Sequence, residues 1–312
     1  MEVTLEQLRF ERDGRRILDV PRLRFPANTT TAVFGPNGSG KTTLLRLLAG
    51  LEQPTAGRVV SGDRPAFAFQ EAVFVRGSVR YNLDLALRLR EVPAGERAGR
   101  IGEVARESGI AEVLDRSARA LSAGEAQRVN LARTLSLRAP VTLLDEPLAG
   151  IDRVTRDHLL DDLPRLLSTF SATTVLVTHD REEAFRLADH LVILVDGRVR
   201  MAGPKRAVYD APADADCARL LGYTVLPTEG GPIAVPPGGW KLATGPITFR
   251  LTATSVVDMG RHWHVIGAAG GVRVDVRLPP DAALPERGAS LEITPTTFVA
   301  LAPTLENPVL PV

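Results

Sequence analysis

Residues 35–43 read Gly35-Pro36-Asn37-Gly38-Ser39-Gly40-Lys41-Thr42-Thr43, which fits the phosphate-loop pattern of a glycine, four free positions and Gly-Lys-Ser/Thr. The β-branched and apolar run 30–34 before it predicts a buried strand. The run 43–49 after it predicts a helix that ends at Gly50. Strand, loop and helix together make this stretch the point from which the rest of the fold is predicted.

The loop has the chemistry of a phosphate-binding site. Its glycines let consecutive backbone N–H groups turn inward, and the following helix adds the positive end of its dipole. Lys41 brings a full charge to the β- and γ-phosphates, and the hydroxyl of Thr42 is placed to ligate Mg²⁺. A glycine-rich turn without a ligand is the alternative. The complete set of features favours binding of a nucleoside triphosphate.

Length and composition restrict the class of protein. The chain has 312 residues, which predicts two domains, each able to bury a core. Its net charge of +1 gives no argument for a nucleic-acid partner. A single cysteine, Cys217, suits a reducing compartment. No apolar run approaches the ~20 residues of a membrane helix, and the N-terminus lacks the features of a signal peptide. We therefore expect a soluble, cytoplasmic chain that meets a membrane only through a partner.

The first 222 residues predict an α/β domain with a mainly parallel sheet covered on both faces. Alternating runs around Asp13-Gly14 predict an antiparallel hairpin over residues 3–25. Residues 72–139 have a helical texture and predict a helical subdomain. Further strands and helices then alternate, which is typical of a parallel sheet; the strands are expected at 58–60, 66–70, 141–144, 173–178 and 191–195.

The character of the chain changes at residue 223. Residues 223–312 are rich in Pro, Gly, Thr and Val and show no helical periodicity. The stretch 230–239 is interpreted as a loop. Short strands are expected at 247–257, 263–268, 272–278 and 291–293. This pattern predicts a small all-β domain, a barrel. His262 and His264 are interpreted as strand surface, because two ligands are too few for a metal site.

Several motifs join the phosphate loop in a characteristic order. They are Gln70, Leu121-Ser122-Ala123-Gly124-Glu125, Leu143-Leu144-Asp145-Glu146-Pro147 and His179. With them the chain resembles the nucleotide-binding subunit of ATP-binding cassette (ABC) transporters. The resemblance covers roughly the first 220 residues, and the Ser-x-Gly-Glu signature is its specific part. It implies an ATPase that uses ATP and Mg²⁺.

Four polar residues that follow predicted strands are the expected hydrolytic groups. Asp145 ends a buried strand, where ligands of open α/β sheets collect, and can hold Mg²⁺ through a coordinated water. Glu146 can polarise the attacking water. The resemblance implies that Gln70 reaches the metal and that water, and that His179 contacts the γ-phosphate and holds Glu146. The alternative for Asp145 and Glu146 is that they are only acidic residues at a turn. Gln70 could instead be an ordinary hydrogen-bonding amide, and His179 a structural histidine.

The signature segment has two compatible interpretations. Ser122 and Glu125 form the pattern of a capping box at a helix start. In the family, Ser122 and Gly124 would serve the nucleotide held by a second copy, so that a homodimer encloses two ATP molecules. Ala123 and Glu125 replace the commoner Gly and Gln, and the Glu125 carboxylate suits this place only if it faces the backbone. Asp152 occupies the loop that communicates across the dimer.

One position departs from the family. Its members usually stack an aromatic side chain on the adenine just before the first hairpin turn. Here that place holds Arg12, with Phe10 two residues earlier. A guanidinium plane can also stack on a base. Arg12 is therefore the candidate for contact with the base, and Phe10 is the alternative platform.

The β domain after the ATPase resembles importer subunits that carry an oligonucleotide-fold-like (TOBE-type) barrel. The segments 69–79, 85–90 and 122–129 resemble the molybdate and tungstate branch most. This implies a peripheral subunit on the inner face of a bacterial membrane, bound to permease subunits and served indirectly by a substrate-binding protein. Sulfate, iron, polyamine or sugar cargo is the alternative; an exporter ATPase and a non-transport ABC ATPase are others.

Overall fold

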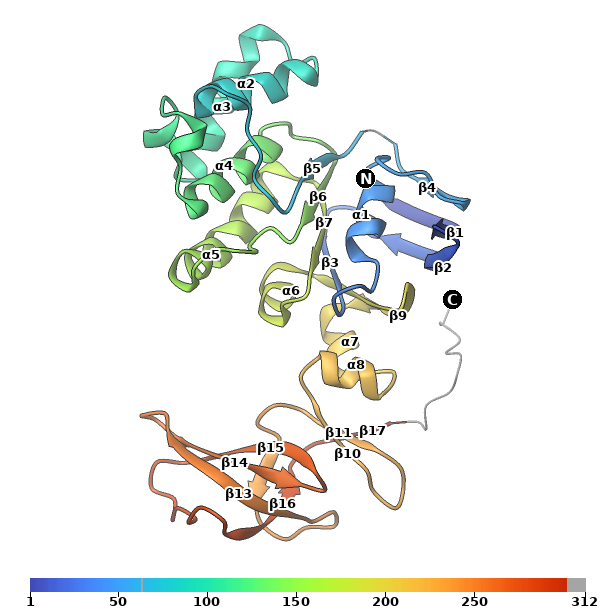
Figure 1. The fold of residues 1–312 in the computed structure, drawn as a ribbon, viewed down its shortest axis with the longest axis vertical. Helices are drawn as coiled ribbons and strands as arrows, with labels where there is room; N and C mark the ends of the chain where they lie inside the picture. The colour runs from blue at the N-terminus through green and yellow to red at the C-terminus, as the bar shows by residue number, and fades with distance from the viewer. Residues whose placement is uncertain (63, 302–312) are drawn as a thin grey trace. The chain divides into compact units, whose positions relative to one another are not determined.

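The computed structural model describes residues 1–62 and 64–301 (Figure 1), and these residues form two compact units. The first unit runs from residue 1 to 205 and the second begins at residue 206. Residues 302–312 of the predicted β domain lie outside the described part of the chain. The assignment of 1–222 and 223–312 as domains remains a prediction.

The first unit is built on a mainly parallel sheet, as the sequence predicts. Its strand order is β5-β6-β7-β3-β8-β9, in which the first five strands are parallel and β9 is antiparallel to β8. β6 and β7 are buried along their whole length, which explains why they are β-branched and apolar. The bounds are β3 Thr30–Phe34, β5 Ala66–Ala68, β6 Val141–Asp145, β7 Thr173–Thr178, β8 His190–Val195 and β9 Arg198–Pro204.

Helices cover both faces of this sheet. Figure 1 shows α5 and α6 on one side, and α1 together with a small antiparallel sheet on the other. α1 packs on β6 and β7, and α6 packs on β3 and β7. The bounds are α1 Lys41–Leu48, α5 Arg153–Phe170 and α6 Arg181–Leu187.

The antiparallel sheet has the order β2-β1-β4, with β1 Val3–Arg12, β2 Arg15–Phe25 and β4 Ala56–Val60. Its predicted hairpin is present. Asp13 and Gly14 form the turn with φ values of 51° and 73°, which is the left-handed region that Asp-Gly turns use. The start of β2 packs closely against the phosphate loop: a Cβ added to Gly40 would lie only 2.8 Å from Cδ2 of Leu18.

The predicted helical texture of residues 72–139 corresponds to three α-helices and two short 3₁₀ turns. Ser78 begins the first helix by accepting a hydrogen bond from the backbone N–H of Tyr81 at 3.1 Å. Gly109, with φ 67°, follows the second. The bounds are α2 Val79–Leu89, α3 Ala94–Glu107 and α4 Ala123–Leu135, with 3₁₀ turns at Ala111–Val113 and Ala118–Ala120.

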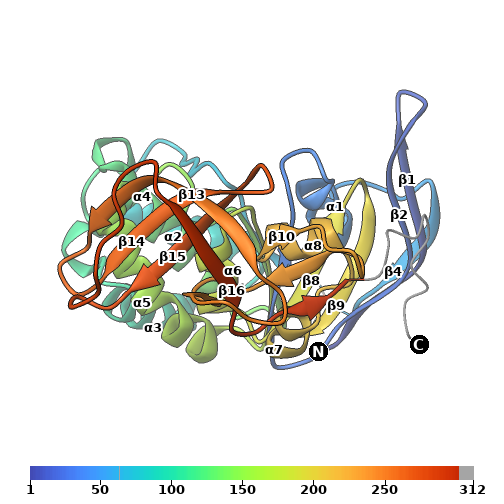
Figure 2. The ribbon, with the colours of Figure 1, turned by 90° about the horizontal axis from the view of Figure 1, so that it is seen from below.

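The second unit is a small barrel-like antiparallel structure, which confirms the predicted fold class (Figure 2). Its larger sheet has the order β12-β16-β13-β14-β15, and the two edge strands β12 and β15 contact each other, so the sheet is nearly closed. A core that includes Trp240, Leu251, Val265 and Val276 fills it. The bounds are β12 Trp240–Leu242, β13 Phe249–Asp258, β14 Trp263–Ala269, β15 Val272–Leu278 and β16 Ser290–Pro295.

A second, three-stranded sheet has the order β10-β11-β17, and it corrects one interpretation. β11 lies inside the stretch 230–239 that the sequence suggests is a loop. Its three residues are all buried, and the strand pairs with β10 on one side and β17 on the other. The bounds are β10 Thr224–Leu226, β11 Ile233–Val235 and β17 Val299–Ala300, and two short helices precede them, α7 Lys205–Asp210 and α8 Ala215–Leu220.

The two histidines at the start of β14, His262 just before it and His264 within it, are hydrogen-bonded to each other. Nε2 of His262 lies 2.7 Å from Nε2 of His264, whose Nδ1 lies 2.9 Å from Oδ2 of Asp275. Within residues 1–62 and 64–301, no cluster of three or more His, Cys, Asp or Glu side chains is placed to hold a metal ion. Nor does the described part contain a helix with the length and apolar character needed to span a bilayer.

Candidate functional site

Four of the predicted site elements meet because the strands before them are parallel. The carboxyl ends of β3, β5, β6 and β7 lie at one edge of the sheet, so the residues that follow them converge there. A cleft of about 560 Å³ opens at this edge. Its lining consists of Ile17, Asn37, Gly38, Gly40, Lys41, Thr42, Thr43, Gln70, Glu146 and His179.

The phosphate loop is held in shape by its own backbone. Gly40, at the N-cap of α1, has φ 98°, a conformation that side chains rarely adopt. Nζ of Lys41 donates to the carbonyl oxygens of Gly35 and Pro36, both at 2.9 Å. Burial lowers the pKa of Lys41, and the charges of Glu146 and Asp145 oppose this effect. The ammonium group is thus directed back over the loop, where a phosphate would meet it.

The hydroxyl of Thr42 donates to Oδ1 of Asp145 at 3.0 Å. Asp145 is only 4% exposed, and burial raises the pKa of its carboxyl group against the opposing hydrogen bond from Thr42. A buried carboxylate beside a hydroxyl offers oxygen ligands that suit a hard divalent cation, and the nearby Lys41 ammonium suits a phosphate. In addition, Oγ of Ser39 is buried without a hydrogen-bond partner. These observations fit a site for a nucleotide phosphate and Mg²⁺.

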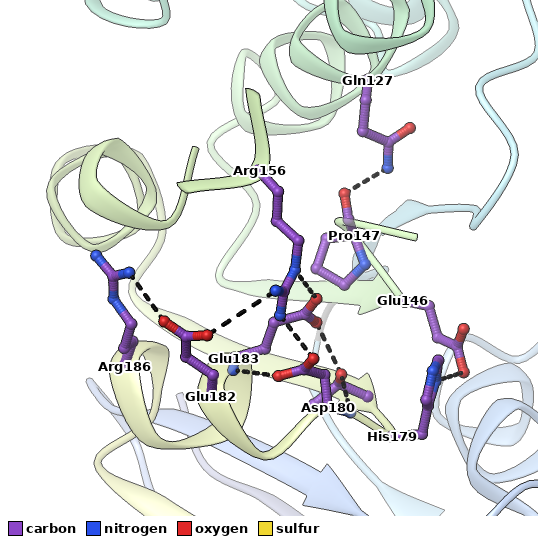
Figure 3. Close-up of polar contacts among 10 residues, drawn as sticks. Gln127, Glu146, Pro147, Arg156, His179, Asp180, Glu182, Glu183 and Arg186 are labelled. Carbon is purple, nitrogen blue, oxygen red and sulfur yellow. Dashed lines mark hydrogen bonds and ion pairs between the residues drawn. The ribbon is translucent and has the colours of Figure 1, made fainter. Parts of the chain in front are cut away.

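Glu146 is held from two sides. Nε2 of Gln70 donates to its Oε2 at 3.2 Å. On the other side, Nδ1 of His179 lies 3.0 Å from its Oε1 (Figure 3). Its backbone has φ 42°, a left-handed conformation that costs about 1–3 kcal/mol in a residue other than glycine. Two backbone hydrogen bonds hold this conformation: Glu146 N–H donates to Val177 O at 3.0 Å, and Ala149 N–H donates to Glu146 O at 3.1 Å. The carboxylate therefore has a defined place in the cleft.

The signature residues form the expected capping box at the start of α4. The backbone N–H of Ser122 donates to Oε2 of Glu125 at 2.8 Å, and the N–H of Glu125 donates to the Ser122 hydroxyl at 3.3 Å. Arg116 also donates to Glu125 at 2.8 Å. The Glu125 carboxylate therefore faces the backbone, the condition under which it suits this place.

A second cluster joins the signature to Asp152. The Asp152 carboxylate accepts from the N–H of Thr155 at 3.1 Å and thereby caps α5. Gly124 is buried, and a Cβ on it would lie 2.6 Å from Cγ2 of Thr155. Ser122, Gly124, Glu125 and Asp152 thus lie on one connected surface. None of them lines the cleft in the described part of the chain.

α4 also links two parts of the cleft, which the sequence did not predict. Nε2 of Gln127 donates to the carbonyl of Pro147 at 2.6 Å (Figure 3). Nδ2 of Asn130, one turn later, donates to the carbonyl of Phe69 at 3.0 Å. These carbonyls belong to the residues next to Glu146 and Gln70. The buried polar face of α4 therefore fixes the backbone on which both side chains depend.

Arg12 does not line the cleft. Its Nη2 lies 2.7 Å from Oε1 of Glu52, and its guanidinium carbon lies 5.4 Å from the centroid of the Phe10 ring. Ile17 on β2 lines the cleft instead, and it was not predicted as a site residue. The alternation of β2 carries the only signal for it: Leu18 is fully buried, so Ile17 must face the other way.

An apolar groove of about 470 Å³ lies beside Gln70. Several of its side chains are exposed although they are large and apolar: Phe69 (47%), Val75 (46%) and Leu89 (73%). Arg133 closes one side, and its guanidinium lies 5.0 Å from the ring centroid of Phe74. Exposed apolar side chains gathered in one groove are characteristic of a surface that binds another protein.

Comparisons with known proteins agree with this geometry. Residues 18–149 match the family model described as ABC transporter. The Fe(3+) ions import ATP-binding protein FbpC of Streptomyces coelicolor is 34% identical over 316 residues, which is 90% of each chain. The sulfate/thiosulfate import ATP-binding protein CysA of Thermosynechococcus vestitus is 36% identical over 234 residues, covering 71% of this chain and 70% of that protein.

A similar fold occurs among solved structures. That of cbiO1 from Clostridium perfringens, described as part of the ABC transporter complex cbiONQ, has a TM-score of 0.60. It covers 70% of this chain and 92% of that chain at 24% identity. At this level of identity the likeness supports the fold alone.

Proposed function

Since the chain belongs to the ATP-binding subunits of ABC transporters, which are ATPases coupled to transport, we propose that Glu146 and the cleft around it hydrolyse ATP to power a bacterial importer. The observation that carries this proposal is the position of the Glu146 carboxylate. It is held between Gln70 and His179, next in sequence to Asp145, in a cleft whose floor is the phosphate loop.

Binding is the task of the loop and its lysine. The backbone N–H groups of residues 35–43 and the start of α1 receive the phosphates, and Lys41 exchanges its two carbonyl partners for phosphate oxygens. Mg²⁺ would be held by Thr42, by Asp145 through a coordinated water, and by Gln70. It would offset negative charge on the β- and γ-phosphates.

Hydrolysis needs a water molecule held in line with the γ-phosphorus. Glu146 orients this water and accepts its proton, because its carboxylate is fixed and faces the cleft. His179 keeps the carboxylate in place and contacts the γ-phosphate. Ser122, Gly124 and Asp152 act on the nucleotide of a second copy, which makes the working form a homodimer. Their separate, connected surface outside the cleft supports this assignment.

The substitution Glu146→Gln tests the site, because it keeps size and hydrogen-bonding reach but removes the ability to accept a proton. Turnover should fall by ~10²–10⁴-fold, the usual effect of losing a general base. ATP binding should persist, and size-exclusion chromatography should show an ATP-dependent dimer that ADP does not support. Glu91→Gln is the matched control, since Glu91 is an exposed glutamate with a similar φ of 57° that does not line the cleft. A Glu146→Gln variant with wild-type turnover would contradict the assignment.

The groove beside Gln70 is the proposed contact with the permease. Binding there places a membrane subunit next to the residue that reaches the metal and the attacking water. The chain itself would lie in the cytoplasm, peripheral to the inner face of the membrane. A substrate-binding protein would act on the permease and only indirectly on this subunit. Leu89→Glu would place a charge in the groove and should abolish co-purification with the permease while leaving basal ATPase activity unchanged.

For cargo we propose an oxyanion such as molybdate or tungstate, on the resemblance of residues 69–79 and 122–129 to that branch. The relatives support the oxyanion class through sulfate and also favour a second candidate, Fe³⁺. Calorimetry of the full-length dimer tests whether the C-terminal unit senses such an anion. Heat of binding with molybdate or tungstate, together with slower ATP turnover, would support it. No heat with either oxyanion would leave the unit a dimer contact.

A further inference from the structure

One arginine of α5 contacts the start of α6, the helix that follows His179. Arg156 lies on α5, and its guanidinium is surrounded by three carboxylates from the start of α6 (Figure 3). Nη2 lies 2.7 Å from Oδ2 of Asp180, Nε lies 3.3 Å from Oε1 of Glu183, and Nη1 lies 3.9 Å from Oε2 of Glu182. The first of these acidic residues directly follows His179.

The pair of Arg156 and Glu183 is shielded from solvent, whereas the Asp180 and Glu182 side chains are 36% and 53% exposed. The Glu183 side chain is 6% exposed and that of Arg156 is 19% exposed. The hydroxyl of Thr178 donates to Oε2 of Glu183 at 2.7 Å and accepts from the N–H of Asp180 at 3.0 Å. The N–H of Glu183 in turn donates to Oδ1 of Asp180 at 3.1 Å. The turn from β7 into α6 is thus closed on itself, and Arg156 joins it to a different helix.

The place of Arg156 on α5 connects this turn to the signature surface. Its backbone N–H donates to the carbonyl of Asp152 at 2.9 Å, so it lies in the first turn of that helix. Its neighbour Thr155 packs against Gly124. On the other side, the residue before Asp180 is His179, which lies 3.0 Å from the Glu146 carboxylate. The guanidinium therefore stands between the two groups of predicted site residues.

We propose that Arg156 is a positioning residue for ATP hydrolysis: through Asp180 and Glu183 it fixes the turn that carries His179 against the first turn of α5. This proposal rests on the proposed function, because it assigns a role to His179. His179 is half exposed, with a side-chain exposure of 53%, so its own packing does not fix the ring. The ring therefore depends on its contact with Glu146 and on the backbone of the turn that carries it. A displacement of about 1 Å at a catalytic group can cost ~10²-fold in rate.

The competing explanation is that Arg156 only compensates the buried Glu183 carboxylate. The energetics allow both roles, since removing one partner of a buried ion pair leaves an uncompensated charge and destabilises the fold. The two explanations differ in what happens when both charges are removed. Stability then returns in either case, whereas turnover returns only if the arginine has no positioning role.

Arg186 provides a matched control. Arg186 on α6 joins the same two helices through its ion pair with Asp161 of α5, and it also pairs with Glu182 of its own helix at 3.3 Å. Its side chain is 34% exposed, and it contacts neither Asp180 nor Glu183 within the described polar contacts. Arg186→Gln therefore removes an arginine that bridges α5 and α6 but leaves the turn with His179 intact.

The experiment compares Arg156→Gln, Arg186→Gln and the double variant Arg156→Gln/Glu183→Gln in the full-length dimer. ATP affinity, thermal unfolding and steady-state turnover are measured for each. We expect Arg156→Gln to lower kcat by ~10- to 100-fold with KM for ATP changed less than about twofold. Arg186→Gln should keep kcat within about twofold of the wild type. The double variant should regain the unfolding temperature but not kcat.

A double-mutant cycle with His179→Ala tests the route of the effect. If Arg156 acts through His179, adding Arg156→Gln to His179→Ala should lower the residual turnover by less than about threefold. The proposal would be overturned if the two arginine variants had equal kcat, or if kcat recovered in the Arg156→Gln/Glu183→Gln variant. It would also be overturned if the losses caused by Arg156→Gln and His179→Ala multiplied in full when the two changes were combined. A His179→Ala variant with wild-type turnover would instead contradict the proposed function at that residue.

Discussion

At the scale of single residues, the backbone of Glu146 is the most informative feature. Its left-handed conformation follows directly after the buried end of β6, where the chain must stop being extended. This turn places the Glu146 side chain between Gln70 and His179, where a residue of a continued extended strand would not lie. Local strain of this kind persists only where surrounding contacts hold it, and the hydrogen bond from Glu146 to Val177 is one of them.

Base recognition gives the first prediction. Ile17 is the only large apolar side chain among the described lining residues of the cleft, and no Phe, Tyr or Trp is among them. Arg12 is engaged by Glu52, and a guanidinium face is less selective than a fitted ring. We expect GTP to support hydrolysis within about tenfold of ATP, a difference of ~1.4 kcal/mol. Competition between the two nucleotides in steady-state turnover measures it.

Two variants sharpen this test. Arg12→Tyr supplies a ring at the place where the family has one and should increase the preference for ATP. Glu52→Gln removes the ion-pair partner of Arg12 and frees its guanidinium, so it should change the preference less than the ring does. A preference of the wild type for ATP by a hundredfold or more would show that another group supplies the platform.

The residues that follow parallel strands were predictable, because strand direction alone brings them to one edge. That rule places Gln70, Asp145, Glu146 and His179 together, whereas the roles of Gln70 and His179 were expected only from the family resemblance. By contrast, Gln127 acts through a carbonyl 20 residues away. Nothing in local sequence distinguishes such a buried amide from a surface one. Its role could be seen only after α4 was placed against β5.

At the scale of elements, α5 continues through Pro164 without interruption. The proline faces solvent, while Leu163 and Leu166 beside it are buried. Proline removes the bond to the carbonyl four residues earlier, and on the solvent side water can replace that bond. This explains why a residue that usually ends helices is tolerated in the middle of an 18-residue helix.

The second prediction concerns this proline. Pro164→Ala restores the N–H and should raise the free energy of unfolding of the first unit by about 1–2 kcal/mol, after the lost rigidity of the unfolded chain is subtracted. Denaturant unfolding followed by far-UV circular dichroism measures it. Pro93→Ala is the control, since Pro93 lies at the N-cap of α3, where its missing N–H costs nothing. Equal changes in the two variants would contradict the explanation.

Short elements were the hardest to predict. β11 has three residues with glycines and prolines on both sides, so its flanks dominate the local signal. It is a strand because β10 and β17 pair with it, and these partners are non-local. α8 has a local signal, an Asp214 N-cap that accepts from the N–H of Cys217 at 2.8 Å, but only six residues. Tertiary contacts determine the secondary structure of such short segments, so local propensity alone cannot predict it.

At the scale of the whole molecule, the two compact units can be observed separately. The chain has two tryptophans, Trp240 and Trp263, and both lie in the second unit. Trp240 is 4% exposed and belongs to the core of that unit. Intrinsic tryptophan fluorescence therefore reports the unfolding of the second unit alone, while the helix signal in circular dichroism comes mainly from the first.

This separation allows the last prediction, which concerns Tyr223 and pH. Its hydroxyl donates to the carbonyl of Tyr209 at 2.7 Å, and the side chain is 7% exposed. Burial, with smaller contributions from Tyr209 and Asp210, raises the pKa of Tyr223 to about 12. The folded state thus favours the protonated phenol. Its contribution to stability is complete below about pH 10, the value for a free phenol, and is lost as the pH rises through about 12.

Tyr223→Phe should therefore show a weaker alkaline dependence than the wild type. At neutral pH it should be less stable by about 1 kcal/mol, because one hydrogen bond is lost. Between pH 10 and 12 the wild type should lose stability faster, so that the difference shrinks. Urea unfolding followed by tryptophan fluorescence measures both effects. If the free energy of unfolding changed with pH in the same way in both proteins across this range, the pKa of Tyr223 would not be higher in the folded than in the unfolded chain.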